Sequence, residues 1–293
     1  MYAIRTVGLT KSYGNHRALS NLNLQVEEGD LFGFIGPNGA GKTTTIRLLM
    51  GLLQPTDGEA SIFGMTCGSR ARDIHRQVGY LSGDVMLPEW MATRDACRML
   101  SLAYKRNLAN DFAALCERFK LPDSVRVRDM SRGMRQKLGL IMVLAPNPGL
   151  LILDEPTTAL DPLTRDSLCD LLREKSNQGH TVFFSSHVLS EVSDLCRNVA
   201  VIRKGQLVAD EALTTLRARA RRQCILVWDG PPPPLPHFLE VSCQQGQQWT
   251  AWLNAEPPTL LEWLHGKNLA DMTLGPPDLD RLFREYYVDE EAS

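Results

Sequence analysis

Between a short apolar run and a stretch with helical spacing, the chain reads Gly36-Pro37-Asn38-Gly39-Ala40-Gly41-Lys42-Thr43. This stretch fits the pattern GxxxxGK[ST] in the strand-then-helix setting that the pattern requires. Its glycines let successive backbone N–H groups turn inward around phosphate oxygens, and the following helix adds the positive end of its dipole. We expect Lys42 to reach the β- and γ-phosphates of a nucleotide, the Thr43 hydroxyl to bind Mg²⁺, and Thr44 to line the same site. The alternative is a glycine-rich turn that only joins a strand to a helix.

A pair of carboxylates follows a second apolar run. Asp154 ends the run Gly149–Asp154, and Glu155 comes directly after it. A continuous apolar run of this kind is typical of a strand that is buried on both faces of a sheet. Taken alone, such a pair most often belongs to a solvated turn. Because it lies downstream of a phosphate-binding loop, we expect Asp154 to bind Mg²⁺ through water, and Glu155 to orient or deprotonate a water that attacks the γ-phosphate.

Strand and helix signals alternate over most of the chain. Continuous apolar runs occur at Leu31–Ile35, Gly149–Asp154 and Thr181–Ser186, and helical spacing resumes after them. Strands that alternate with helices predict an α/β fold with a mostly parallel sheet and helices on both faces. Asn21–Val26 alternates with period two, which predicts antiparallel strands near the N-terminus. From about residue 93 to residue 145 the pattern is helical throughout, so we expect a helical insertion there.

The last quarter of the chain differs from the rest in charge and composition. The whole chain has 32 Lys and Arg against 34 Asp and Glu, but from Cys224 onward there are three basic residues and eleven acidic ones. The proline run Pro231–Pro234 cannot join a central strand. We therefore expect a domain of residues 1–220 and a small acidic α+β domain of residues 221–293. In the second domain we expect strands that start at Cys224, Phe238, Trp249 and Leu269, and helices at Pro257–His265 and Leu279–Tyr287.

Composition excludes several classes of protein. The chain has 293 residues, of which 43% are hydrophobic and 23% charged, and this globular composition excludes wholesale disorder, a collagen-like repeat and a coiled-coil rod. The longest apolar stretch, residues 138–153, is broken by glycine and proline, whereas a spanning helix needs about 20 mostly apolar residues. The first residues hold no apolar run after a basic cluster, so we expect no secretory signal peptide. Seven scattered cysteines without a CxxC pair predict a reduced, cytosolic chain, not a disulfide framework or a zinc site.

A motif between the two phosphate-site motifs resembles the signature of the ATP-binding cassette (ABC) ATPases. Met130–Lys137 contains SRGMRQK, which is similar to the family's LSGGQ, and Ser131 and Gly133 keep its key positions. The resemblance covers about residues 2–215, with the motifs in the family's order. It implies a P-loop NTPase cassette, followed here by a small C-terminal α+β domain. On the residues alone, Ser131 also suits the N-cap position of a helix.

Three other matches extend the resemblance. Thr158–Asp161 is similar to the family's D-loop, His187 to its switch histidine, and Tyr13 to the aromatic residue that stacks on adenine. Each has a simpler alternative, because a lone tyrosine in a loop is usually a surface residue and a lone histidine after a strand is usually structural. One departure is Gly83, which stands where the family usually has a glutamine that contacts Mg²⁺. Asp84 follows it and could take over that contact.

The resemblance implies a mechanism that needs two cassettes, identical or paralogous. They would meet head to tail, with ATP and Mg²⁺ between the phosphate loop of one chain and Ser131 and Gly133 of the other. Glu155 and His187 would be the catalytic residues, with His187 contacting the γ-phosphate and helping to hold the carboxylate and the water in line. Hydrolysis would remove the γ-phosphate contacts and reopen the dimer.

The leading functional hypothesis is an ATPase subunit that powers a membrane exporter. Its partners would be separate transmembrane permease subunits, with the chain on the cytoplasmic face of the membrane, and no nucleic acid is expected. The C-terminal domain resembles the extensions of cassette subunits in bacterial drug and antibiotic exporters. The alternatives are a cassette subunit of an importer, a soluble cassette ATPase that acts on ribosomes or nucleic acid, and a P-loop kinase, which would lack the signature and the switch histidine.

Overall fold

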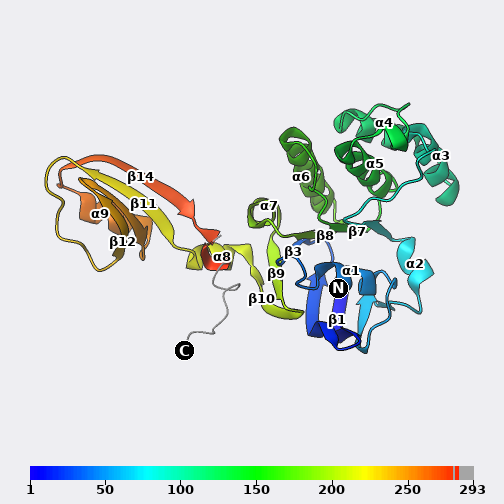
Figure 1. Ribbon diagram of the computed structural model, residues 1–293, viewed down its shortest axis with the longest axis horizontal. Coiled ribbons are helices and arrows are strands. Elements are labelled where there is room, and N and C mark those ends of the chain that lie inside the picture. Colours follow the sequence, from blue (N-terminus) through cyan, green and yellow to red (C-terminus); the bar gives the residue numbers. More distant parts are fainter. Residues whose placement is uncertain (280, 284–293) are drawn as a thin grey trace. The chain divides into compact units, whose positions relative to one another are not determined.

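Figure 1 shows the computed structural model, which describes residues 1–279 and 281–283. The chain divides into two compact units, Met1–Glu211 and Ala212–Ser293. The sequence predicts a boundary near residue 220, whereas the division falls before helix α8 (Leu213–Arg219). The composition changes only after this helix, so the sequence pattern does not assign the helix to the second unit.

A six-stranded sheet forms the centre of the first unit, with the strand order β10-β9-β3-β8-β7-β6. Its strands are β3 (Leu31–Ile35), β6 (Val78–Leu81), β7 (Leu150–Asp154), β8 (Thr181–Ser186), β9 (Asn198–Arg203) and β10 (Gln206–Ala212). The pairs β3–β8, β3–β9, β7–β8 and β6–β7 are parallel. Every residue of β3, β7 and β8 is buried, because layers cover the sheet on both faces. The predicted α/β fold with a mostly parallel sheet is confirmed.

A second sheet of the first unit has the order β2-β1-β4-β5. Its strands are β1 (Tyr2–Tyr13), β2 (His16–Glu27), β4 (Asp57–Ile62) and β5 (Met65–Thr66). Strand β1 pairs antiparallel with β2 and with β4, which confirms the prediction from the alternation in Asn21–Val26. Helix α1 (Lys42–Leu49) buries Ile46 and Leu49 in a hydrophobic cluster that also contains side chains of β2 and β7. Packing against both sheets therefore fixes the start of this helix.

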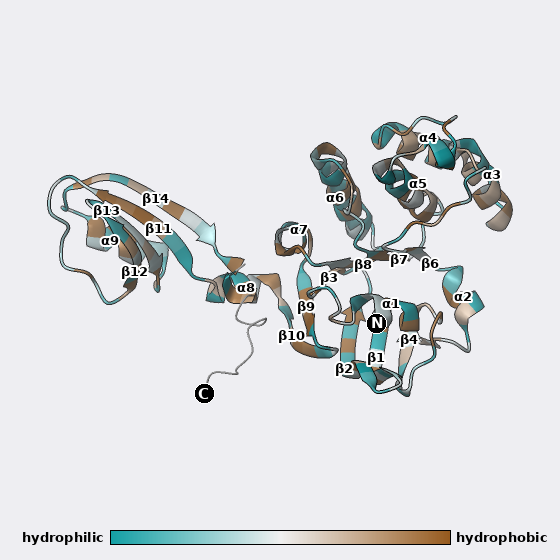
Figure 2. Cartoon of the chain, viewed as in Figure 1, coloured by the Kyte–Doolittle hydropathy of each residue, from teal (hydrophilic) through white to brown (hydrophobic). Residues whose placement is uncertain are grey.

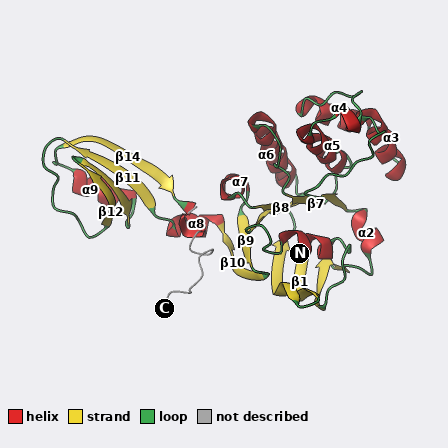
Figure 3. Cartoon of the chain, in the orientation of Figure 1, coloured by secondary structure: helices red, strands yellow, loops and turns green. Residues whose placement is uncertain are grey.

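Further helices cover the six-stranded sheet on the side opposite α1 (Figure 3). They include α5 (Arg132–Leu144), α6 (Pro162–Asn177) and α7 (Leu189–Leu195), while α2 (Ala71–His75), α3 (Thr93–Ala103) and α4 (Ala109–Arg118) lie further from its centre. The segment 93–145 contains α3, α4, a 3₁₀ turn at Val127–Asp129 and α5, so it is helical with breaks. Within the described residues, no helix is long and apolar enough to cross a membrane.

The second unit contains a four-stranded antiparallel sheet of order β12-β13-β11-β14. Its elements are β11 (Arg222–Trp228), β12 (Leu239–Gln245), β13 (Gln248–Leu253), β14 (Leu269–Pro277) and α9 (Pro257–Leu264). Strand β11 changes from hydrophilic residues at its start to hydrophobic ones further along (Figure 2). The ring of Trp228 packs edge to face on Trp249 and Trp263 in the core. The four predicted strands and the helix at Pro257–His265 are confirmed, and the predicted helix Leu279–Tyr287 lies largely outside the described residues.

Candidate functional site

The phosphate loop joins β3 to α1 and places Lys42 at the start of the helix. Gly41, the N-cap residue of α1, has a φ of 112° and offers no side chain to cap the first turn, whose N–H groups can therefore face an anion. A Cβ at Gly36 would stand 2.4 Å from the carbonyl oxygen of Ile202, so the loop can run there only with glycine. The Lys42 side chain is buried, and its Nζ donates to the carbonyl oxygen of Gly36 at 2.6 Å. The loop thus closes around the ammonium group.

The structure brings Thr43 and Asp154 together at the ends of α1 and β7. Thr43 Oγ1 donates to Asp154 Oδ2 at 2.9 Å, and Ser185 Oγ donates to Asp154 Oδ1 at 2.6 Å. Gly83 adjoins this pair, because a Cβ there would stand 3.8 Å from Asp154 Oδ2. Hydroxyl and carboxylate oxygens are the ligands that Mg²⁺ prefers in proteins. The donor set therefore fits a magnesium ion.

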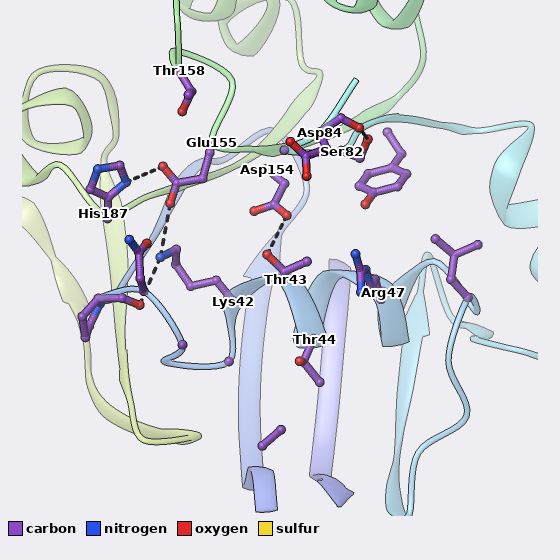
Figure 4. A pocket seen from close by; sticks show the side chains of 18 of the residues that line it. Lys42, Thr43, Thr44, Arg47, Ser82, Asp84, Asp154, Glu155, Thr158 and His187 are labelled. Atoms are coloured by element: carbon purple, nitrogen blue, oxygen red, sulfur yellow. Dashed lines mark hydrogen bonds and ion pairs between the residues drawn. The ribbon is translucent and has the colours of Figure 1, made fainter. Parts of the chain in front are cut away.

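Glu155 connects Lys42 with His187 (Figure 4). Its Oε1 lies 3.2 Å from Lys42 Nζ, and its Oε2 lies 2.6 Å from His187 Nδ1. Its φ of 50° is in the left-handed region, which a residue with a side chain rarely adopts and which recurs at active sites as well as in turns. The two residues that the sequence predicts as catalytic therefore contact each other directly, beside the phosphate loop.

These side chains line one groove of about 1030 Å³. Of the predicted ATP-binding residues it is lined by Tyr13, Pro37, Asn38, Gly39, Gly41, Lys42, Thr43 and Thr44. Gly36 and Ala40 are buried and do not line it. Tyr13 is 46% exposed, with Lys11 Nζ 5.3 Å from its ring centroid, so a cation already lies over the ring. The groove is also lined by Tyr80, whose pKa is raised by burial and by the nearby carboxylate of Asp154.

Ser131 and Gly133, the two residues predicted to belong to the signature, do not line the groove among the described residues, although Arg132 between them does. Ser131 is the N-cap of α5, and its Oγ accepts a hydrogen bond from the N–H of Met134 at 3.2 Å. A Cβ at Gly133 would stand 2.7 Å from the carbonyl oxygen of Ala159, so the start of α5 packs directly on the predicted D-loop. Gly133 thus lies against the predicted D-loop, and neither Ser131 nor Gly133 lines the groove of its own chain among the described residues.

Gly83 and Asp84, which stand where the sequence departs from the family pattern, lie at the groove. Both residues line it, and Ser82 Oγ donates to the carbonyl oxygen of Asp84 at 2.6 Å. This turn leaves the Asp84 side chain near the groove without a contact to the Thr43–Asp154 pair among the hydrogen bonds of the described residues. Asp84 is accordingly not assigned as a metal ligand.

The buried polar residues Ser185, Ser186 and Glu191 lie near the groove and belong to no predicted motif. Ser185 bonds to Asp154, and Glu191 Oε2 accepts hydrogen bonds from Ser186 and from Thr157, each at 2.8 Å. The sequence holds a signal for the two serines, because they end the otherwise apolar strand β8 and a buried hydroxyl needs a hydrogen-bond partner. Glu191 gives no such signal, since a glutamate on a short helix is usually exposed.

Comparison with known proteins identifies a family model and relatives that match this chain. A family model described as "ABC transporter" matches residues 19–158. The bacitracin transport ATP-binding protein BcrA of Bacillus licheniformis is 36% identical over 230 residues, which cover 75% of this chain and 72% of the relative. The Nod factor export ATP-binding protein I of Cupriavidus metallidurans is 31% identical over 283 residues, which cover 93% of each chain.

Solved structures give the same result for the fold. The ATP-binding subunit of an ABC transporter superposes with a TM-score of 0.69 at 27% identity, covering 74% of this chain and 92% of that one. The dimeric cassette MJ0796 superposes with a TM-score of 0.66 at 23% identity, covering 72% of this chain and 98% of that one, and this likeness shows the fold. Taken with the two relatives, these findings show that the chain belongs to the ABC transporter family.

Proposed function

We propose that ATP binds in the groove and is hydrolysed there, with Glu155 orienting or deprotonating the attacking water. The observation that carries this proposal is the contact of Glu155 with both Lys42 and His187. A γ-phosphate in the groove competes with Glu155 for the ammonium of Lys42, because both are anions. Glu155 then keeps His187 as its partner, and its Oε1 is free to accept a hydrogen bond from water next to the phosphate.

The other residues of the groove hold the nucleotide. Thr43 and Asp154 would hold Mg²⁺, which when bound neutralises charge on the β- and γ-phosphates. The Thr43 hydroxyl, which donates to Asp154 Oδ2 in this structure, would offer its oxygen lone pairs to the ion. The backbone N–H groups of residues 38, 39 and 41–44 surround the phosphates, and Tyr13 stacks on the adenine with the ring face that Lys11 leaves open.

Ser131 and Gly133 act on the ATP of a second cassette in a head-to-tail dimer. Two observations support this part of the proposal. Ser131 is exposed at the N-terminus of α5, where N–H groups and the helix dipole suit a phosphate. Neither residue lines the groove of its own chain, among the residues that the structure describes. A γ-phosphate between two such chains would hold the dimer closed, and its loss would release it.

The dimer powers a membrane exporter through separate permease subunits, with the chain on the cytoplasmic face of the membrane. The printed names of the two relatives refer to bacitracin transport and to Nod factor export. Large apolar side chains are exposed on α3 and on the loop before it, namely Met86, Trp90, Met99 and Leu102. Exposed apolar side chains on neighbouring stretches are typical of an interaction surface. This surface suits an apolar segment of a permease.

Purification from solubilised membranes tests this function. The tagged chain, expressed with its natural permease, is expected to carry a polytopic membrane protein with it. Leu102→Glu is expected to lose that partner and to keep its ATPase activity in solution, because Leu102 is 79% exposed and lies outside the groove. Leu261→Glu, at a leucine of α9 that is 54% exposed, serves as the control and should keep the partner. Recovery of ribosomes or RNA in place of a membrane protein would favour the soluble alternative.

A further inference from the structure

We propose that Ser185 and Ser186, the last two residues of β8, are positioning residues that hold different halves of the ATP site. Ser185 holds the carboxylate of Asp154, and Ser186 acts with Glu191 on the loops of the two catalytic residues. Both serines are fully buried. Consecutive residues of a strand point to opposite faces of the sheet, so the two hydroxyls reach different neighbours. The inference rests on the proposed function and concerns how the reacting groups are held.

Ser185 fixes the metal-binding carboxylate. Its Oγ donates to Asp154 Oδ1 at 2.6 Å and accepts from the N–H of Glu155 at 3.2 Å. These contacts follow from the parallel register of β7 and β8, in which Asp154 lies opposite Ser185. Since Thr43 bonds to Oδ2, each oxygen of Asp154 has its own partner. Hydrogen bonds to a ligating group from behind orient it toward the metal, and their loss typically weakens metal affinity by about 10- to 100-fold.

Ser186 fixes the loop of the switch histidine. Its Oγ donates to Glu191 Oε2 at 2.8 Å and accepts from the N–H of Val188 at 2.9 Å. Ser186 and Val188 are the chain neighbours of His187, so one hydroxyl ties down both sides of the histidine. The same Glu191 oxygen accepts from Thr157 Oγ1 at 2.8 Å, two residues beyond the catalytic glutamate. A single carboxylate oxygen therefore joins the two loops whose side chains meet in the groove.

The carboxylate of Glu191 is suited to this task by its burial. Glu191 is 8% exposed, and its Oε1 lies 3.6 Å from Arg165 Nε. A buried carboxylate is costly unless it is paired and hydrogen-bonded, and here two hydroxyls and a guanidinium group supply its partners. An apolar contact would join the loops without that cost. Unlike an apolar contact, these hydrogen bonds also fix the relative orientation of the two loops, because hydrogen bonds are directional.

The experiment compares Ser185→Ala and Ser186→Ala, with Ser176→Ala as the matched control. Ser176 is also a buried serine, and its hydroxyl donates one hydrogen bond, to the carbonyl oxygen of Gly29 at 3.0 Å, on α6 away from the groove. Calorimetry gives the ATP affinity at a series of Mg²⁺ concentrations and in EDTA. Phosphate release gives kcat and KM, and thermal melting gives Tm.

The two serines are expected to give different phenotypes. Ser185→Ala should raise the Mg²⁺ concentration that gives half of the full ATP affinity by about 10-fold, with the affinity in EDTA unchanged. Ser186→Ala should leave that Mg²⁺ concentration unchanged and lower kcat by about 10-fold at constant KM, because the reacting groups are misplaced. Glu191→Gln keeps an acceptor oxygen and should retain more kcat than Glu191→Ala. In a His187→Ala background, Ser186→Ala should cost little further kcat.

Equal effects of the two serine variants on Mg²⁺ dependence and on kcat would overturn the inference. So would effects no larger than those of Ser176→Ala, or losses of kcat that follow Tm alone across the three variants. Absence of Mg²⁺-dependent ATP binding in the unaltered chain would instead overturn the proposed function. The two failures are thus distinguished by the unaltered chain.

Discussion

Lys42 Nζ contacts the carbonyl oxygens of Gly36 and Pro37 and the carboxylate of Glu155, and an ATP phosphate would replace or share these contacts. Lys42→Ala removes a buried charge from the place proposed for the β- and γ-phosphates. We expect ATP affinity to fall by at least about 10-fold, because charge-assisted hydrogen bonds contribute about 1.5–3 kcal/mol. Calorimetry with Mg²⁺ present measures this. Lys267→Ala, in the second unit, is the control, and an unchanged affinity of Lys42→Ala would contradict the assignment of the phosphate loop.

Glu155 can be tested separately from binding. Glu155→Gln keeps the size of the side chain and its hydrogen bonding to His187 but removes the negative charge. We expect turnover to fall by about 10²-fold or more, which is the usual range for loss of a general base, while ATP affinity is retained. Phosphate release and calorimetry on the same preparation measure the two quantities. Turnover close to that of the unaltered chain would exclude Glu155 as the residue that activates water.

At the scale of residues, the sequence predicts those site residues that belong to a local sequence motif. The phosphate-binding loop at Gly36–Thr43 can be predicted from the sequence, because the loop is defined by the spacing of its glycines and its lysine. The position of Asp154 and Glu155 at the end of a buried strand can also be predicted, because an apolar run comes directly before them. The partnership of Ser185 with Asp154 depends on the register between β7 and β8, which no single stretch of sequence contains. The same holds for Glu191, whose partners Ser186 and Thr157 lie at the end of β8 and in the loop after β7.

The N-cap residue of α6 is Asp161, whose carboxylate also pairs with Lys137 of helix α5. Asp161 accepts hydrogen bonds from the hydroxyl and the N–H of Thr164 at 2.7 and 3.0 Å, and it lies 3.1 Å from Lys137 Nζ of α5. The hydrogen bonds from Thr164, and then the one from Lys137, hold the pKa of Asp161 well below its usual range. A carboxyl with a lowered pKa in the folded state stabilises the fold above its ordinary pKa, and this contribution is lost as the pH falls through the lowered pKa.

This cap predicts a pH-dependent effect of Asp161→Ala on Tm. The variant should melt below the unaltered chain at pH 7, because the negative charge is then present. The difference in Tm should narrow as the pH falls below about 4, where the carboxyl in the unfolded chain becomes protonated. Asp170→Ala, at an exposed carboxyl of α6 paired with Arg173, is the control. A difference in Tm that stays constant from pH 7 to about pH 2 would show that the charge of Asp161 contributes nothing.

At the scale of elements, apolar periodicity predicts the type of each element better than its limits. The buried strands β3, β7 and β8 follow directly from their apolar runs. Helix α8 belongs to the second of the two compact units, which begins at Ala212, whereas the change in composition that predicts a boundary near residue 220 follows this helix. The close approach of Gly133 to Ala159 brings together two motifs that are separate in the sequence. Only the tertiary fold could reveal that contact.

At the scale of the whole molecule, one chain carries complementary parts of two proposed sites. The groove holds Lys42, Thr43 and Glu155, and the exposed N-terminus of α5 carries Ser131 for a second cassette. The sequence alone predicts this division only through the family resemblance. The structure adds a physical reason, because Gly133 packs on the predicted D-loop and Ser131 does not line the groove of its own chain in the described part of the chain.

The proposal that each ATP site is shared between two chains is tested most directly by size-exclusion chromatography with light scattering, with and without MgATP. Glu155→Gln should bind ATP and keep it unhydrolysed, so it should elute with MgATP at twice the mass of the 32.7 kDa chain and without nucleotide at the mass of one chain. The double variant Ser131→Arg/Glu155→Gln should bind ATP with similar affinity, because the groove is intact, and should remain a monomer. Dimerisation of the double variant to the same extent as Glu155→Gln, or a Glu155→Gln protein that stays monomeric with ATP bound, would contradict the head-to-tail site.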